Sequence, residues 1–234
     1  MSNKNTRGYC SEKIIAKFRL ALETARDDVR RGDVENVSIS FENSKMGPVA
    51  SVSFVPFFTC PAVCFETCGP KCYAAKIANL RPSVLRSYAV NQALFEIRPA
   101  LFWRQVDAAL KAVRFFRFNV AGDVPGMSYF NAVCDRAIDN PKTDILIFTK
   151  RYDVVNARIA KCGPLPDNLK CLFSGWENLE PCNPSHLPET NVIPRGQDPR
   201  PGWKVCGGNC FTCACRGVGC WQAGAGDVIA FPMR

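Results

Sequence analysis

The sequence predicts an α/β fold built on a parallel sheet that is either open or curled into a partial (β/α) barrel. In residues 115–174, short apolar segments alternate with helical segments over short connections. This alternation is typical of parallel strands covered by helices. The chain has 234 residues, of which 47% are hydrophobic, and is therefore long enough to bury the core of one domain.

The N-terminal part is predicted to form one helix followed by two strands. Residues 11–31 carry apolar side chains at helical spacing, with Gly32 placed to end the helix: Ile15, Phe18, Leu22 and Val29. Residues 37–41 and 50–55 alternate with a period of two around a turn at 43–48. We therefore expect a strand, a turn and a second strand there.

The elements of the predicted core then follow in order. Pro82 and Pro99 can each occupy the first position of a helix, the first of which reaches Ile97. Strands are predicted at 115–120, 144–149 and 171–174, and helices at 129–138 and 154–160. The first of these strands interleaves arginine with phenylalanine, and we predict a buried core strand rather than a platform for stacking bases.

We predict one domain, 1–234, in three parts: an N-terminal helix in 1–36, an α/β partial-barrel core in 37–179 that includes the first cysteine cluster, and a cysteine-rich segment in 180–234. The last part is rich in Pro, Gly, Asn and Cys, so it is predicted to be irregular, with 228–231 as a candidate for a short final strand.

Charge and hydropathy indicate the environment and the partners. No apolar run is long enough to span a membrane, and the first residues lack a secretory signal, so we expect a soluble, cytoplasmic protein that does not bind membranes. Lys and Arg exceed Asp and Glu by 30 − 21 = 9. This excess favours a polyanion, RNA or DNA, as a partner.

Fourteen cysteines are the most unusual feature of the composition. In the reducing cytosol they indicate metal or cluster ligation rather than disulfides. The chain has one histidine, His186, so a metal would be held mainly by thiolates, which suit zinc or iron–sulfur clusters. Five cysteines stand alone and are predicted to be ordinary buried or surface thiols: Cys10, Cys134, Cys162, Cys171 and Cys182.

The other nine cysteines form two constellations. The first constellation comes directly after a predicted strand and contains four cysteines in thirteen residues. All four are candidate metal ligands: Cys60, Cys64, Cys68 and Cys72. Prolines and a glycine within this run favour a loop that wraps a cluster and offers backbone amides to the sulfurs. The second holds five cysteines in fifteen residues, from which we favour four ligands: Cys206, Cys210, Cys213 and Cys220.

We leave Cys215 out of the second ligand set because a single residue separates it from Cys213. A four-cysteine zinc site fits the second set almost as well as a four-iron cluster does, since cysteine spacing alone does not select the metal. The cofactor prediction is therefore one or two [4Fe–4S] clusters, with zinc as the alternative at the C-terminal site.

Polar side chains also stand at the predicted ends of strands, where parallel sheets gather functional groups. Asp123 and Lys150 are the candidate catalytic residues, because a carboxylate and an amine beside Ser174 could exchange protons or hold a ligand. The alternative is that Asp123 caps the following turn and that Lys150 is solvated.

These motifs together resemble the phage gene product 88 family, which is itself similar to the radical SAM enzymes. The matching residues run in order from Asn43 to Phe231: Asn43-Ser44-Lys45, Cys68-x3-Cys72-Tyr73-Ala74 with Lys76, Val120-Ala121-Gly122-Asp123, Phe148-Thr149-Lys150, Leu172-Phe173-Ser174-Gly175-Trp176, Cys206-x3-Cys210-x2-Cys213, Cys220-Trp221 and Gly226-Asp227-Val228. The resemblance implies a radical SAM-like partial barrel with a four-iron cluster on the loop after an early strand.

The chain departs from the radical SAM pattern in two ways. Three residues separate each pair of neighbours in the first cysteine set, in place of the usual Cys-x3-Cys-x2-Cys, and no Gly-Gly-Glu is present. Four thiolates would close the iron that binds S-adenosylmethionine. We therefore predict an iron–sulfur protein that does not cleave this cofactor and acts in redox chemistry or on nucleic acid. The alternatives are a true radical SAM enzyme, and a nucleic-acid-binding protein or nuclease with structural iron–sulfur or zinc sites.

Overall fold

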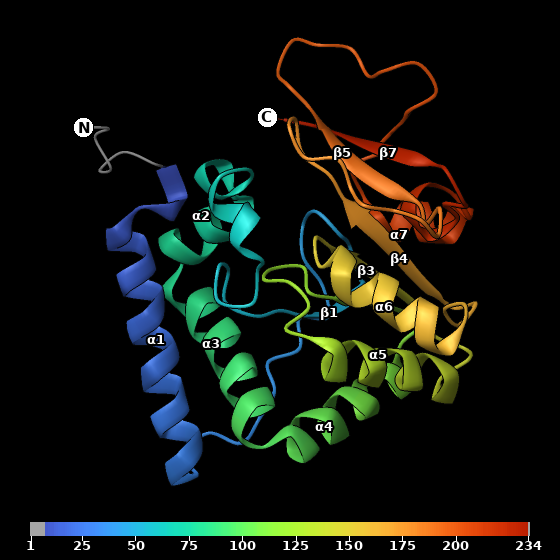
Figure 1. The fold of residues 1–234 in the computed structure, drawn as a ribbon. Helices are drawn as coiled ribbons and strands as arrows, with labels where there is room; N and C mark the ends of the chain where they lie inside the picture. The colour runs from blue at the N-terminus through green and yellow to red at the C-terminus, as the bar shows by residue number, and fades with distance from the viewer. Residues whose placement is uncertain (1–7, 234) are drawn as a thin grey trace. The chain divides into compact units, whose positions relative to one another are not determined.

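The computed structural model describes residues 8–233, which divide into two compact units. Unit 1 contains the residues up to Ile39 together with 52–109 and 119–123. Unit 2 contains 40–51, 110–118 and the residues from Val124 onward. The chain is traced in Figure 1, and the presence of a single domain stays a prediction.

Unit 1 is helical. Its elements are η1 (Gly8–Cys10), α1 (Glu12–Arg31), η2 (Ala62–Phe65), η3 (Gly69–Lys71), α2 (Tyr73–Leu80), α3 (Pro82–Ile97) and most of α4 (Pro99–Ala112). The predicted N-terminal helix is confirmed as α1, which packs against α3 through one fully buried face: Phe18, Leu22, Ala25 and Val29. Gly32 ends α1 in the left-handed conformation at φ 82°, which glycine adopts without strain.

Unit 2 contains the parallel part of a sheet. The strands are β1 (Ala50–Val52), which begins here and ends in unit 1, β2 (Phe115–Phe118), β3 (Asp144–Thr149), β4 (Leu169–Ser174), β5 (Glu189–Ile193), β6 (Lys204–Val205) and β7 (Val228–Pro232). Their order in the sheet is β1-β2-β3-β4-β5-β7-β6, and the pairs from β2 onward are parallel. The α/β prediction is confirmed, and this arrangement is compatible with a partial barrel.

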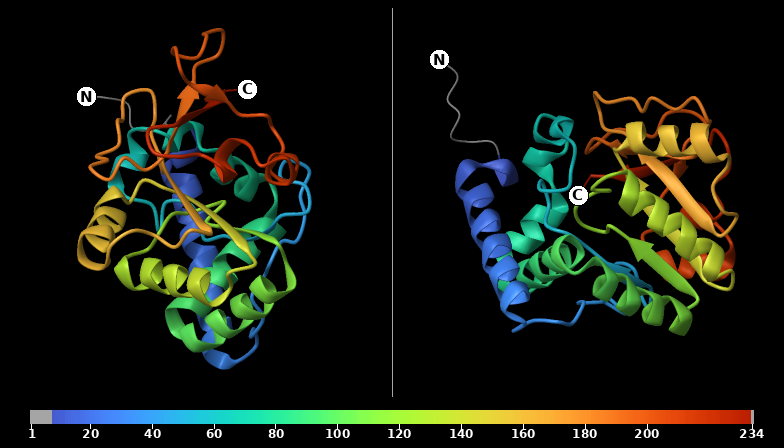
Figure 2. Two further views of the ribbon diagram at one scale, coloured as in Figure 1. Left: turned by 90° about the vertical axis from the view of Figure 1, so that its right-hand side faces the viewer. Right: turned by 60° about the horizontal axis from the view of Figure 1, so that its bottom comes forward.

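Two helices cover one face of these strands. Helices α5 (Met127–Asp139) and α6 (Tyr152–Cys162) lie side by side along the sheet (Figure 2). The central strands are apolar without alternation because both of their faces are covered: the residues Ile145, Leu146, Ile147, Leu172 and Phe173 are fully buried. Among residues 8–233 no helix is long and apolar enough to cross a membrane.

The predicted strand at 37–41 is wrong. Only Ser40 makes an isolated bridge, to Ser51. The backbone amides of Val37 and Ser38 donate instead to the side-chain oxygens of Gln105 at 2.8 Å and Asn91 at 2.7 Å. Because these side chains take the hydrogen bonds that a neighbouring strand would need, the segment is extended without belonging to a sheet.

The segment from residue 180 onward is more regular than predicted. It contains β5, β6, β7 and helix α7 (Cys210–Arg216), and the expected final strand is confirmed as β7. β5 and β7 pair in parallel, with Thr190 opposite Ile229. Helix α7 begins where the Asn209 side chain accepts a hydrogen bond from the Thr212 amide, and it ends at Gly217 in the left-handed conformation. The cysteines are therefore held on ordinary elements of secondary structure.

Candidate functional site

The first cysteine group lies in unit 1 on the short 3-10 turns η2 and η3, between β1 and α2. As the prolines and glycine predicted, no α-helix crosses this run. Two of its sulfurs accept backbone hydrogen bonds at 3.4 Å: Cys60 from the Phe57 amide, and Cys72 from the Ala75 amide at the start of α2. Backbone amides that donate to sulfur are common around thiolate ligands of metal centres.

Three thiols of this group form a hydrogen-bonded chain. Cys64 is buried, and it is hydrogen-bonded to both Cys60 and Cys68. The bond with Cys60 raises the pKa of Cys64 most, the bond with Cys68 lowers it, and burial and the Asp123 carboxylate raise it further. Cys64 is thus the central sulfur of the group and remains protonated in the absence of a positive partner.

Cys10, predicted to stand alone, lies beside this group. A Cβ atom added at Gly69 would lie 3.4 Å from the Cys10 sulfur and 2.6 Å from the Cys64 carbonyl oxygen. The Cys10 thiol donates to the Phe65 carbonyl at 3.7 Å. The turn η1 therefore packs directly on the cysteine loop and brings a fifth thiol to it. The separation of 55 residues in sequence gives no signal of this contact.

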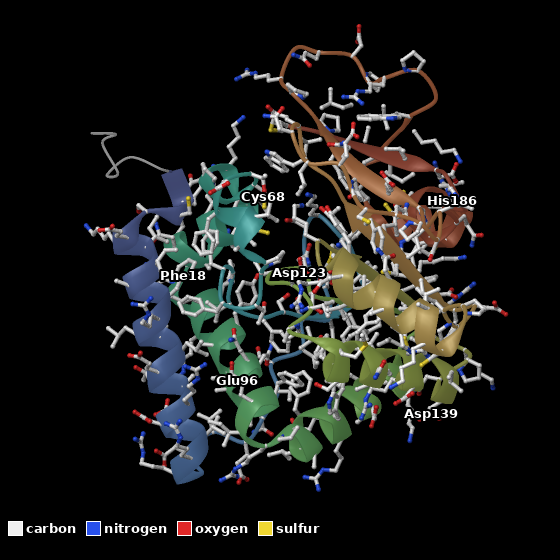
Figure 3. The ribbon with its side chains drawn as sticks, in the orientation of Figure 1. Phe18, Cys68, Glu96, Asp123, Asp139 and His186 are labelled. Atoms are coloured by element: carbon white, nitrogen blue, oxygen red, sulfur yellow. The ribbon has the colours of Figure 1, made fainter. Side chains whose placement is uncertain are left out.

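Asp123 lies on a tight turn of the same unit. Gly122 adopts φ 74°, and a Cβ atom there would come within 2.7 Å of the Thr59 hydroxyl. The Asp123 amide donates to that hydroxyl at 2.9 Å, and Asp123 is 5% exposed. Since Thr59 directly precedes Cys60, this turn holds Asp123 beside the first cysteine group; Figure 3 labels Asp123 and Cys68.

The second cysteine group lies in unit 2. Cys206 follows β6, and its amide donates to the Ala230 carbonyl of β7 at 2.8 Å. Cys210 and Cys213 are three residues apart on α7 and share one face of it, and Cys220 lies in the turn η4 (Gly219–Trp221). Cys215 is exposed, and its position on the helix places it away from that face.

The four cysteines predicted as ligands are close enough to affect the pKa values within their group. Burial raises the pKa of Cys220 to about 12, followed by the effects of Cys206, Cys210 and Cys213, while Arg117 lowers it. Burial, Cys206 and Cys210 likewise raise the pKa of Cys213. The fold therefore brings together the four cysteines that spacing selected and leaves Cys215 outside.

Two glycines lie next to the Cys213 sulfur. A Cβ atom at either Gly207 or Gly219 would lie 3.5 Å from the Cys213 sulfur. The Gly208 amide donates to the Cys206 sulfur at 3.4 Å. The loops thus provide space and backbone amides next to the sulfurs, which is what metal–thiolate sites use.

A cation lies against the second group. Arg117 of β2 donates from Nη1 to the Cys210 sulfur at 3.3 Å and to the Met46 sulfur at 3.2 Å, and its guanidinium lies 4.7 Å above the Phe148 ring. Its Nε is buried and has no hydrogen-bond partner. No carboxylate among the described residues forms an ion pair with Arg117. The contact was not predicted, because the phenylalanines of β2 indicate only a core strand.

The donor chemistry of both groups fits soft metals. Sulfur ligands select zinc, copper(I) or iron–sulfur clusters over magnesium or calcium. Within residues 8–233 no three or more Cys, His, Asp or Glu side chains already have the arrangement of a metal-ion site. Metal binding would therefore require the thiols of each group to lose protons and close around the metal.

Four isolated cysteines are the buried or surface thiols that were predicted. Cys134 and Cys171 are buried in unit 2, and Cys162 and Cys182 are exposed. Burial is the main cause that raises the pKa of Cys134, to about 11. A thiol with so high a pKa is a packing residue rather than a nucleophile.

Lys150 and Ser174 come together at the carboxyl ends of β3 and β4. The Lys150 ammonium donates to the Ser174 hydroxyl at 2.7 Å and lies 5.9 Å from the Trp176 ring centre. Lys150 is 9% exposed, so the alternative of a solvated lysine is wrong. The next two backbone amides already donate hydrogen bonds, Gly175 to the Thr190 carbonyl and Trp176 to the Leu179 carbonyl. This pair can hold a polar ligand, but those amides do not supply an oxyanion hole.

Asp123 belongs to unit 1 and Lys150 to unit 2. Their joint catalytic role stays a prediction. In unit 1, Cys60, Cys64, Cys68 and Cys72 lie on one loop, and in unit 2 the four predicted ligands act electrostatically on one another.

The fold and these sites define an α/β protein with two separate cysteine groups, one on the loop after β1 and one on a helix and loops near the C-terminal end. A family model described as "Gene product 88" matches residues 23–220, which include both groups. The chain therefore belongs to this phage gene product family. Neither the curated proteins nor the solved structures contain a match to the chain.

Proposed function

We propose that this protein is an iron–sulfur protein of radical SAM-like fold that acts in redox chemistry or on nucleic acid and does not cleave S-adenosylmethionine. The observation that carries the proposal is the second cysteine group, where four cysteines act electrostatically on one another and the Arg117 guanidinium donates to the Cys210 sulfur. The ligands would be Cys206, Cys210, Cys213 and Cys220 at this site, and Cys60, Cys64, Cys68 and Cys72 at the first.

The charge at the second site supports ligation by thiolates. A half-buried guanidinium whose partners are one cysteine sulfur, one methionine sulfur and an aromatic ring keeps part of its desolvation cost. Four thiolates around a divalent zinc ion or an oxidised four-iron cluster would carry a net charge of about −2. Such a centre would give Arg117 a negatively charged partner.

The first group supports a closed cluster. Four cysteines lie on the loop 60–72, and Cys10 packs against it as a fifth. A cluster with three thiolate ligands leaves one iron open, whereas a neighbouring fourth thiol competes at the effective concentration of a tethered group. A cluster held in this way supplies one-electron transfer when bound. The number of thiols at this site therefore favours electron transfer or structural support over cleavage of S-adenosylmethionine.

Reduction of protein purified without oxygen tests this proposal. We expect a broad visible absorbance that dithionite bleaches and air or a mild oxidant restores, because thiolate-held iron–sulfur clusters change charge on reduction. A zinc-loaded sample of the same chain is the control and should show no such absorbance. Protein that contains metal but shows no bleachable absorbance would contradict the iron–sulfur assignment.

The positive charge of the chain favours nucleic acid as a second candidate partner. The formal net charge is +9, and two oxidised four-thiolate clusters would lower it to roughly +5. We expect RNA or DNA binding with little sequence preference and a steep loss of affinity as salt rises, because phosphate contacts release counterions. Titration of a labelled oligonucleotide at several salt concentrations measures this. If no binding occurs at about 50 mM salt, a small-molecule or protein redox partner becomes the better assignment.

A further inference from the structure

We infer that Arg117 is a positioning residue of the C-terminal metal centre: its guanidinium donates to the Cys210 sulfur, compensates the negative charge of the centre and raises its reduction potential. The inference rests on the proposed function, since it requires a metal bound by Cys206, Cys210, Cys213 and Cys220.

The register of β2 places Arg117 at this site. Successive side chains of a strand point to opposite faces, so Phe115 and Arg117 share one face and Phe116 and Phe118 share the other. Phe118 packs against Tyr129 of α5, with ring centres 6.3 Å apart. Phe115 packs against Phe211 of α7 and Trp221 of η4, with ring centres 6.1 and 5.4 Å away. The face that carries Arg117 is therefore the one covered by the cysteine segment.

One backbone hydrogen bond ties the cysteine segment to Met46, and one side-chain hydrogen bond ties its two ends together. The Phe211 amide donates to the Met46 carbonyl at 2.8 Å, and the Trp221 indole donates to the Cys210 carbonyl at 3.0 Å. Met46 is 2% exposed, and its sulfur is the second acceptor of Arg117. The guanidinium is thus held between Cys210 of α7 and Met46, whose carbonyl is hydrogen-bonded to the same helix.

The partners of Arg117 distinguish it from arginines with a structural role in the same chain. Several of those pair with carboxylates within 3 Å: Arg26 with Glu96, Arg98 with Glu35 and Arg151 with Asp153. Arg117 contacts two sulfurs and the Phe148 ring. A metal–thiolate centre in this group would supply the negative charge that a guanidinium usually has nearby.

The positive charge of Arg117 should raise the reduction potential of the C-terminal centre. Reduction adds an electron to a centre that is already negative, and a nearby cation and an N–H···S bond stabilise the added charge. Removal of the guanidinium charge should therefore make reduction less favourable. We expect at least a tenfold change in the equilibrium constant of reduction, which is about 59 mV for a one-electron couple.

The test uses the full chain with Cys64→Ser and Cys68→Ser as the parent, so that only the C-terminal centre is loaded. Arg117→Met removes the charge at similar length, Arg117→Lys restores it, and Arg114→Met is the matched control. Arg114 lies three residues earlier, is exposed, and stacks 5.0 Å from the Phe115 ring without contacting a cysteine. Reduction potential and the rate of iron loss to a chelator are measured for each variant.

We expect Arg117→Met to lower the potential by the stated amount and to lose iron faster, Arg117→Lys to recover most of both, and Arg114→Met to match the parent. An Arg117→Met variant that keeps its iron and its potential would overturn the inference. If Arg117→Met and Arg117→Lys lost iron equally, the inference would also be overturned, because the side chain would then act through its packing and not through its charge. A parent that binds no iron would instead contradict the proposed function.

Discussion

Replacement of Cys210 and Cys213 by serine is expected to abolish the C-terminal centre while the first centre keeps its full metal content. Both cysteines lie on one face of α7, next to the sulfurs of Cys206 and Cys220. A serine hydroxyl is a poor ligand for zinc or iron compared with a thiolate. Loss of two of four ligands should remove the metal completely rather than weaken its binding. Metal analysis of the purified variant measures the effect.

Cys215→Ser is the matched control for this variant, since Cys215 lies on the same helix and is exposed. Its metal content should equal that of the unchanged protein. If Cys215→Ser removed metal and the double variant did not, the selection of four ligands from the five cysteines would be wrong. Because Asn209 caps α7 and Gly217 ends it, the helix itself should form in both variants, and circular dichroism checks that.

Serine at Cys64 and Cys68 is expected to remove the other centre with an effect of similar size. Cys64 is the central sulfur of its group and is hydrogen-bonded to Cys60 and Cys68. The two groups lie in different units, so the loss of one metal centre should not affect the other. A variant that combines both pairs of serine replacements should contain no iron.

Cys162→Ser is the control for the first group, because Cys162 is exposed and belongs to neither group. It should retain both centres. If the Cys64 and Cys68 variant kept the iron content of the unchanged chain, the loop 60–72 would not be a metal site, and its thiols would have another role.

Much of the fold could be predicted because local signals agree with the final packing. Helix α1 has a regular apolar face and a glycine at its end, and β3 has an uninterrupted apolar run, so both were predicted within one residue. The segment 37–41 alternates just as clearly. It fails to form a strand because Asn91 and Gln105 of distant helices take its amides. No local pattern reports such a long-range hydrogen bond.

The candidate site likewise contains residues that the sequence predicts and residues that it does not. Spacing selects the four cysteines of the second group because they lie on one short helix and its flanking loops, where sequence distance limits spatial distance. Cys10 and Arg117 reach their groups from 55 and 93 residues away. A signal for Arg117 exists in the sequence, since an arginine on an otherwise phenylalanine-rich strand needs a polar partner. The partner itself depends on which face of β2 the cysteine segment covers.

Iron–sulfur ligation is tested by the content of iron, acid-labile sulfide and zinc in protein made under anaerobic, iron-replete conditions. We predict brown protein with iron and sulfide in equal amounts, about four of each per chain for each cluster that is loaded. Colourless protein that contains zinc and no labile sulfide would contradict it.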